Sequence, residues 1–178
     1  TFTQFSKLSG AVPMIGVNHG RCFAGNTALL ACCDVIIATQ DSTIAMGGPA
    51  MIEGGGLGIY TPEEVGPMSF QVPNGVVDIL VEDEAEAVQV AKQYLSYFQG
   101  SVDSWEAPDQ RRLRHIVPEN RLRLYDMREV IATIADEDSV LEIREGFGVG
   151  VITCFIRGEG RPMGVIANNP HHLAGAID

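Results

Sequence analysis

The sequence predicts an α/β protein in which short strands and helices alternate in layers. An apolar segment at 12–17 stops at a glycine-containing turn, continues as a helical pattern through Cys33, and returns to an apolar segment at 35–38. A second apolar segment at 76–81 then leads directly into an amphipathic helix at 84–98. Two strands that each feed a helix indicate a sheet covered by helices rather than a set of separate modules.

The first of these units contains the most distinctive turn of the chain. Asn18-His19-Gly20 ends the apolar segment, and the small residues Ala24 and Gly25 stand at the expected start of a helix. Little side chain would cover the backbone N–H groups there, and the first N–H groups of a helix have no partner within it. Two N–H groups aimed at one oxygen can stabilise an oxyanion. We therefore interpret Ala24 and Gly25 as a candidate backbone oxyanion hole, suited to reactions in which substrate or cofactor carries the acid–base groups.

The other elements follow in order. In the first half we expect the end of a helix at 2–8, a strand at 43–46, a glycine-rich loop at 47–58, a helical turn at 62–64 and a turn at 74–75. Asp83 and Glu86 stand in capping-box positions for the helix at 84–98. Beyond it we expect a helix at 125–135, a turn at 139–143, a hairpin with strands at 148–156 and 163–167, and a loop at 168–173.

The region around Trp105 differs in character from what precedes and follows it. It contains Pro108 and Pro118, many arginines and little periodicity, as expected of an ordered linker. We therefore divide the chain into a first half at 1–100, a linker at 101–124 and a second half at 125–178.

The charge balance bears on which partners the chain binds. Its 12 basic and 23 acidic side chains give a formal net charge of −11, which argues against nucleic acid or an anionic membrane surface as a partner. No stretch reaches the roughly 18 continuous apolar residues of a membrane span. The basic residues that do cluster indicate a solvated or ion-paired face, with an anionic ligand as the alternative: Arg111, Arg112, Arg114, Arg121 and Arg123.

The chain offers few side chains for metal or nucleophilic chemistry. The four cysteines have no zinc-ligand spacing, so we expect reduced, buried thiols in a cytosol-like compartment and no metal. Adjacent His171 and His172 could be metal ligands, but neighbours on an extended chain point to opposite faces, which favours solvent or substrate contact. There is no GxSxG motif, and the glycine-rich loop lacks both the GxGxxG order and a following Lys-Ser/Thr. Cys22 is either a thiolate near the helix start with His19 as its base, or a small packing residue.

Five collinear segments carry a resemblance to a known family: Gly20-x-Cys22-x-Ala24-Gly25, Gly48-Pro49 with Glu63-Glu64-Val65-Gly66, Asn74-Gly75-Val76, residues 125–131, and residues 164–178. In this order they resemble the GxCxAG or GPCAGG turn and the GP…EELGG, SGVAH, YDVREVI and GIVGNQP…SGCLD runs of the biotin-dependent carboxyltransferase family. These proteins are the β subunits or domains of acetyl-CoA, propionyl-CoA and methylcrotonyl-CoA carboxylases. The matches cover nearly the whole chain.

The resemblance implies a fold, an activity and a set of site residues. The fold would be the crotonase (ClpP-like) spiral of ββα units, here the end of its N-terminal half and the start of its C-terminal half. The activity would be transfer of a carboxyl group from carboxybiotin to the α carbon of an acyl-CoA, with Ala24 and Gly25 as the biotin-side oxyanion hole. Binding of biotin or substrate would fall to Gly20, Cys22, Phe23, Gly47, Gly48, Asn168 and Asn169.

The resemblance also implies a biotin carboxylase and a biotin carboxyl carrier as partners, a homo-oligomer, and a cytoplasmic location with the mitochondrial matrix as the alternative. We expect the chain to be part of a longer polypeptide, because the family's second oxyanion hole falls after Asp178. Asp78 stands where the family commonly has a histidine. A non-catalytic scaffold of this fold, or another crotonase-fold CoA enzyme such as a hydratase or decarboxylase, remains the alternative, and the sequence does not indicate the acyl chain.

Overall fold

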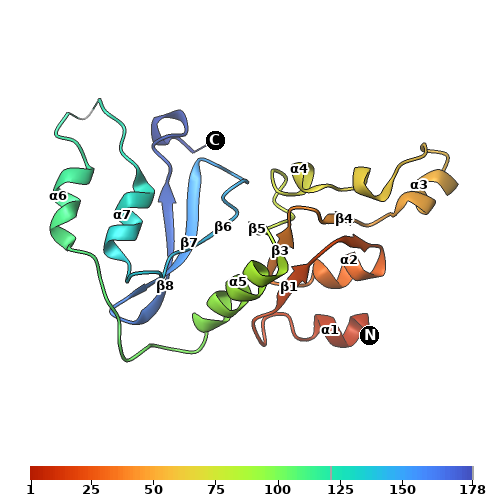
Figure 1. The fold of residues 1–178 in the computed structure, drawn as a ribbon, viewed down its shortest axis with the longest axis horizontal. Helices are drawn as coiled ribbons and strands as arrows, with labels where there is room; N and C mark the ends of the chain where they lie inside the picture. The colour runs from red at the N-terminus through yellow and green to blue at the C-terminus, as the bar shows by residue number, and fades with distance from the viewer. Residues whose placement is uncertain (121, 178) are drawn as a thin grey trace. The chain divides into compact units, whose positions relative to one another are not determined.

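The computed structural model describes residues 1–120 and 122–177 and divides the chain into two compact units, Thr1–Lys92 and Gln93–Asp178. Figure 1 shows both units, and the boundary between them falls within the long helix α5 (Glu84–Ser96). The division of the sequence at 100 and 124 stays a prediction.

The first unit is built on two small parallel sheets. One has the strand order β1-β3-β5, from β1 (Ile15–Asn18), β3 (Val35–Thr39) and β5 (Ile79–Val81). The other pairs β2 (Arg21–Phe23) with β4 (Thr43–Ala45). All five residues of β3 are buried, as the central strand of a covered sheet requires.

Helices and turns cover these sheets. They are α1 (Phe2–Ser6), α2 (Gly25–Leu30), α3 (Pro49–Gly54), the 3₁₀ turn η1 (Pro62–Glu64), α4 (Met68–Gln71) and the start of α5. Helix α2 packs so closely on β1 that a Cβ added at Gly16 would lie 2.4 Å from Leu30 Cδ1. The core joins both sheets to α2 and α4 through Cys22, Leu30, Ile36, Ala38, Ile44, Met68 and Val77.

The second unit is an antiparallel sheet of order β6-β7-β8, from β6 (Leu141–Ile143), β7 (Val151–Gly158) and β8 (Arg161–Asn168). Around it lie η2 (Gln110–Arg112), α6 (Leu113–Ile116), α7 (Met127–Ile134) and η3 (Leu173–Gly175). Ile131 of α7 and the residue after the helix, Ala135, form a core with alternate residues of β7: Ile152, Cys154 and Ile156. Phe155, the residue of β7 between two of these, contacts the rings of Tyr94, Tyr97 and Phe98 instead.

The β7–β8 hairpin turns on two residues with positive φ, Glu159 at 51° and Gly160 at 76°. Two successive positive φ values are those of the tight turn that matches the twist of paired strands. The buried carboxylate of Asp136 accepts hydrogen bonds from both of their N–H groups, at 2.9 and 2.7 Å. This carboxylate therefore supports a left-handed residue at Glu159, where glycine would be expected.

The main elements predicted from the sequence are confirmed, with six differences. The short helices α4 and α6 have no predicted counterpart. The helix after Gly25 ends at Leu30 rather than Cys33, and the short strand β2 lies within the predicted turn. Helix α3 occupies part of the predicted glycine-rich loop, with Pro49 at its first position. Strand β6 replaces the predicted turn at 139–143.

The capping box at the start of α5 forms only in part. The Glu86 N–H donates to Asp83 Oδ1 at 2.9 Å, as predicted. The Glu86 carboxylate, however, accepts from the Glu82 N–H at 2.7 Å rather than from the N–H of Asp83.

Candidate functional site

The turn from β2 into α2 has an unusual backbone conformation. Ala24, which caps α2, has φ 55° and ψ −120°, outside the regions that residues with a side chain normally occupy. The chain enters this residue from a strand and leaves it as the first turn of a helix. This sharp change of direction presents the start of α2 with little side chain around it.

The structure revises which N–H groups are open at this turn. The Ala24 N–H is not one of them, because it donates to the Ala45 carbonyl oxygen at 3.2 Å and so continues the pairing of β2 with β4. The N–H groups of Gly25, Asn26 and Thr27, in the first turn of α2, have no acceptor among the described residues. The open donors therefore begin at Gly25, one residue further along than the pair predicted from the sequence, and we refer to the first two, Gly25 and Asn26, as the open pair.

Several predicted residues come together around this pair. Phe23 packs on Gly48, where an added Cβ would lie 3.4 Å from its ring, and Gly47 precedes the helix α3 that Gly48 caps. At Gly25 an added Cβ would meet only Phe2 Cζ, at 3.4 Å, and at Gly20 it would meet nothing within 4 Å. Beside Gly20 there is thus no side chain of the described residues within reach of an added Cβ, and beside Gly25 there is only the ring of Phe2.

Cys22 does not have the surroundings of a nucleophile. It is 6% exposed, belongs to the core, and accepts a hydrogen bond through its carbonyl oxygen from Thr27 Oγ1 at 2.9 Å. The ring of His19 contacts Thr39 and Glu84 instead of acting as a base for this thiol. The alternative in which Cys22 is the nucleophile and His19 its base is wrong, and the packing alternative is confirmed.

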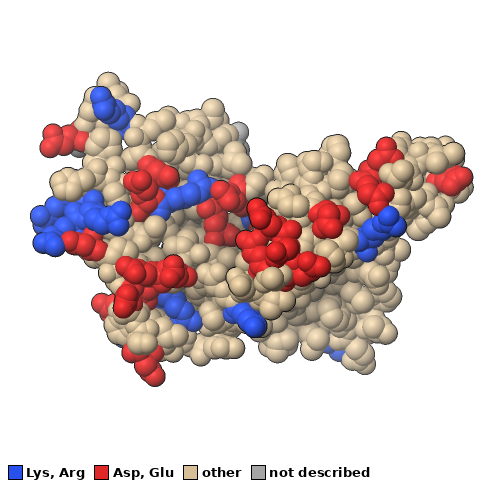
Figure 2. All heavy atoms as spheres, in the orientation of Figure 1, with Lys and Arg blue, Asp and Glu red and all other residues tan. Residues whose placement is uncertain are grey.

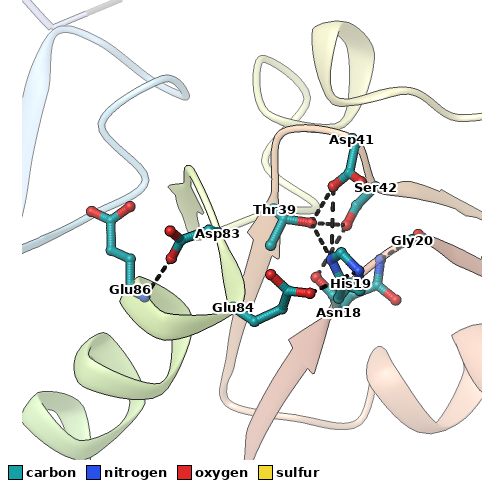
Figure 3. A network of polar contacts seen from close by, with 9 residues as sticks. All are labelled: Asn18, His19, Gly20, Thr39, Asp41, Ser42, Asp83, Glu84 and Glu86. Atoms are coloured by element: carbon teal, nitrogen blue, oxygen red, sulfur yellow. Dashed lines mark hydrogen bonds and ion pairs between the residues drawn. The ribbon is translucent and has the colours of Figure 1, made fainter.

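His19 lies in a polar network that the sequence analysis missed (Figure 3). Its Nδ1 lies 3.3 Å from Thr39 Oγ1, and its Nε2 lies 3.0 Å from Glu84 Oε1. Thr39 donates to Asp41 Oδ1 at 2.6 Å and touches Ser42 Oγ at 3.0 Å. Polar residues directly after two neighbouring parallel strands are the signal that predicts such a cluster, because the carboxyl ends of parallel strands meet at one edge of the sheet.

Ion pairs and hydrogen bonds shift the pKa values of two carboxyl groups near the turn. The hydrogen bond from Thr39 lowers the pKa of Asp41. The guanidinium of Arg21, in β2, binds the Glu63 carboxylate, with Nε at 3.1 Å, and lowers its pKa. The Arg21–Glu63 pair therefore ties η1 to β2, and the Thr39–Asp41 hydrogen bond holds the β3–β4 turn.

Asn168 and Asn169 belong to the second unit and hold the loop after β8. The buried Asn169 amide donates to the Val149 carbonyl at 2.9 Å and accepts from the His171 N–H at 3.1 Å. Asn168 donates to the Gly175 carbonyl at 3.4 Å. Both amides thus have partners inside the unit, and their predicted role in binding stays a prediction.

The distribution of charge is uneven (Figure 2). Acidic side chains gather over the start of α5, where the sequence has Glu82, Asp83, Glu84 and Glu86, and basic ones gather over α6. Within the predicted basic cluster, Arg111 is ion-paired with Asp109 at 2.6 Å, while Arg121 lies outside the described residues. The ion-paired interpretation is confirmed for Arg111.

Among the described residues, no three or more His, Cys, Asp or Glu side chains lie close enough together to hold a metal ion. In the same residues no helix is both long and apolar enough to cross a membrane. The cysteines are free thiols, and burial raises the pKa of Cys154 to about 11.

Comparison with known proteins places the chain among carboxyl transferase domains, with a match over residues 1–178. It is 33% identical to the methylmalonyl-CoA carboxyltransferase 12S subunit of Propionibacterium freudenreichii subsp. shermanii, over 97% of this chain and 34% of that protein. It is 32% identical to the propionyl-CoA carboxylase beta chain of Cereibacter sphaeroides, over 99% of this chain and 37% of that protein. The chain therefore spans about a third of the length of these relatives.

Solved structures give the same result. The structure of a single-chain, multi-domain long-chain acyl-CoA carboxylase matches with a TM-score of 0.98 and 60% identity, over 100% of this chain and 18% of that one. A transcarboxylase 12S structure, described as a hexamer, matches with a TM-score of 0.83 and 31% identity, over 99% of this chain and 36% of that one. The fold is accordingly the crotonase-like α/β fold that the resemblance implied. The chain belongs to the carboxyl transferase domain family.

Proposed function

We propose that the protein is the carboxyltransferase component of a biotin-dependent acyl-CoA carboxylase. It would move a carboxyl group from carboxybiotin to the α carbon of an acyl-CoA. The relatives support this proposal through the reactions in their names, among them carboxylation of propionyl-CoA and transfer to or from methylmalonyl-CoA. Because the chain spans about a third of those relatives, activity, substrate and partners of the whole protein are part of the proposal.

The observation that carries the proposal is the open pair of N–H groups at Gly25 and Asn26. Both lie at the positive end of α2, and neither has an acceptor among the described residues. The donor set suits a neutral or developing anionic oxygen rather than a metal, since a backbone N–H donates and cannot coordinate a cation. The ureido oxygen of biotin fits these donors, and the bound cofactor would supply the carboxyl group.

The chain's own residues would then orient that oxygen and stabilise charge on it. An oxyanion donor acts only if it is held in place before the reaction, and the hydrogen bonds of Ala24 and Thr27 hold this turn. Gly20 and Gly25 leave room for the ligand, and Phe23 with Gly47 and Gly48 forms the adjacent wall. Cys22 would support the turn from the core, and Asn168 and Asn169 would shape a second binding segment.

The proposal extends to cofactor, partners and location. Carboxybiotin on a carrier domain would be the donor and an acyl-CoA the acceptor, with no metal required in this segment. A biotin carboxylase and a biotin carboxyl carrier would be the partners, and the assembly would be a homo-oligomer, as the hexamer of the transcarboxylase 12S structure suggests for the family. We propose a cytoplasmic location, with the mitochondrial matrix as the alternative.

Carboxylation by the full-length protein tests this function. Purified protein is combined with biotin carboxylase, biotinylated carrier, ATP and bicarbonate, and acetyl-, propionyl-, methylcrotonyl- and a long-chain acyl-CoA are offered in turn. We expect incorporation of labelled bicarbonate into at least one of them. Absence of carboxylation, together with absence of malonyl-CoA decarboxylation stimulated by free biotin, would contradict the proposal.

A substitution at the turn separates an enzyme from a scaffold. Gly25→Val places a branched side chain beside the open N–H groups and should lower kcat by about 10²- to 10³-fold, the cost of losing an oxyanion donor. Ala31→Val, at the exposed C-terminal end of the same helix, is the matched control and should leave kcat within about two-fold. A scaffold would show equal assembly and no turnover in all three proteins.

A further inference from the structure

The segment that follows β4 exposes an unusual number of apolar side chains. We call residues 46–60 the apolar arm; it contains α3 and the glycine-rich stretch after that helix, and Glu53 is its one charged residue. Figure 1 shows α3 and the chain after it extending away from the strands of the first unit. Five large apolar side chains of the arm are between 46% and 82% exposed: Met46, Met51, Leu57, Ile59 and Tyr60. Single exposed apolar residues are normal, but a group of this size marks a binding surface.

Backbone hydrogen bonds fold the arm back on the end of α3. The Leu57 N–H donates to the Ile52 carbonyl at 3.1 Å, and the Gly55 N–H donates to the Met51 carbonyl at 3.0 Å. A Cβ added at Gly55 would lie 3.8 Å from Leu57 Cδ1, so the Leu57 side chain lies close to the backbone at the end of the helix. The apolar side chains of the arm are therefore presented by a folded segment.

The arm starts directly beside the open pair. The Ala45 carbonyl accepts from the Ala24 N–H at 3.2 Å and lies 2.9 Å from Thr27 Oγ1. Ala24 and Thr27 are the residues that flank the open pair, and the arm begins one residue after Ala45. Phe23, before Ala24, packs on the arm, because a Cβ added at Gly48 would lie 3.4 Å from its ring. A ligand bound at the open pair therefore has the arm as its neighbouring apolar surface.

The chemistry of the arm and the proposed reaction together indicate its ligand. An apolar surface with one charged residue stabilises hydrocarbon and offers little to the phosphates of coenzyme A or to a charged protein partner. In the proposed reaction the acyl α carbon receives its carboxyl group from a biotin bound at the open pair, so the acyl chain leads away from that point. The two exposed methionines suit chains of different length, since methionine is flexible and polarizable.

We propose that the apolar arm binds the hydrocarbon chain of the acyl-CoA substrate, and that the protein favours acyl groups of medium to long chain. Met51 and Leu57 are specificity-determining residues that contact the chain and not the reacting atoms. The inference rests on the proposed function for the identity of the ligand, and it adds the substrate class, which the open pair by itself does not determine.

Binding of acyl-CoAs to the full-length protein tests the arm without any assay of turnover. Complete burial of a methylene raises affinity about four-fold, and a chain lying on an open surface is covered on one side, so we expect about two-fold per methylene. Isothermal titration calorimetry should then show octanoyl-CoA binding about 16-fold more tightly than butyryl-CoA, which is four methylenes shorter. The double variant Met51→Gln, Leu57→Gln should reduce this ratio to about four-fold and leave the affinity for butyryl-CoA unchanged. The matched control is Val88→Gln, at an exposed position of α5, which should keep the wild-type ratio.

Carboxylation kinetics give a second readout of the same ratio. In the double variant the ratio of kcat/KM for octanoyl-CoA to that for butyryl-CoA should fall by about four-fold, with kcat for butyryl-CoA unchanged. Equal affinity of the wild type for the two acyl-CoAs, or an unchanged ratio in the double variant, would overturn the inference. If light scattering shows that the double variant also dissociates while its ratio is unchanged, the arm packs against a second copy of the chain instead. Inactivity of the wild type with every acyl-CoA, while octanoyl-CoA still binds more tightly, would contradict only the proposed function.

Discussion

Ala24→Gly should stabilise the protein, because Ala24 holds a backbone conformation that glycine adopts more readily. Ala24 has φ 55° and ψ −120°, and a residue with a side chain in such a region costs about 1–3 kcal/mol. Glycine adopts this conformation without that cost. The substitution should therefore release strain that is present only in the folded state.

Two opposing effects reduce the gain. Glycine gives the unfolded chain more conformational freedom, which costs about 0.4–1 kcal/mol. The lost methyl group of Ala24 is half-buried, and its removal costs at most about half of the roughly 0.8 kcal/mol of a fully buried one. The net expectation is a gain of about 1 kcal/mol in the free energy of unfolding.

Urea denaturation of the purified wild type and two variants measures this gain. The matched control is Ala31→Gly at the other end of α2, where φ is −66° and there is no strain to release. It should lower the free energy of unfolding by about 0.5–1 kcal/mol. If Ala24→Gly lowers the free energy of unfolding as much as Ala31→Gly does, the argument that Ala24 is strained is refuted.

Two further predictions concern the core. Gly66→Ala should destabilise the protein by about 3 kcal/mol or more, because φ is 66° and the new Cβ would lie 2.0 Å from the Ile44 carbonyl oxygen. The control is Gly10→Ala, where φ is 74° and no atom lies within 4 Å of the new Cβ. It should cost only about 1 kcal/mol in the same denaturation assay. Burial raises the pKa of Cys154 from its ordinary 9.0 to about 11 in the folded protein, so its contribution to stability should be complete below pH 9 and lost as the pH rises toward 11. The difference in unfolding free energy between the wild type and Cys154→Ala should shrink over that range, and a constant difference would contradict the assignment.

Periodicity was sufficient to predict the elements that local sequence determines. The apolar repeat predicted α5, now observed as Glu84–Ser96, and alternation about a glycine turn predicted the β7–β8 hairpin. Helix α3 was missed because the glycines around it were given more weight than Pro49 at its first position and the Ala-Met-Ile-Glu that follows. Strands β2 and β6 were missed because each has three residues and exists through pairing with a distant strand.

The candidate site shows the same difference between features set by local sequence and features set by contacts between distant residues. The turn itself was visible in the sequence, since glycine and alanine between a strand and a helix predict exposed N–H groups. The state of the Ala24 N–H was not visible, because its acceptor, the Ala45 carbonyl, is 21 residues away and is reached only through the parallel register of β2 and β4. The network of His19 likewise depends on α5 and the β3–β4 turn meeting the end of β1.

The same contacts that hold the strained turn also determine which N–H groups remain for a ligand. The Ala24 N–H binds Ala45, the Ala24 carbonyl accepts from the Ala28 N–H at 3.1 Å, and the Thr27 hydroxyl lies 2.9 Å from both the Cys22 and Ala45 carbonyls and shares its one hydrogen between them. Buried hydrogen bonds contribute about 1 kcal/mol each, which together offset the strain at Ala24. Because one of these bonds occupies the N–H of the strained residue itself, the open donors begin with those of the next two residues. A hydrogen-bonded residue of high strain therefore positions Gly25 and Asn26, and loosening it should reduce catalysis even where it raises stability.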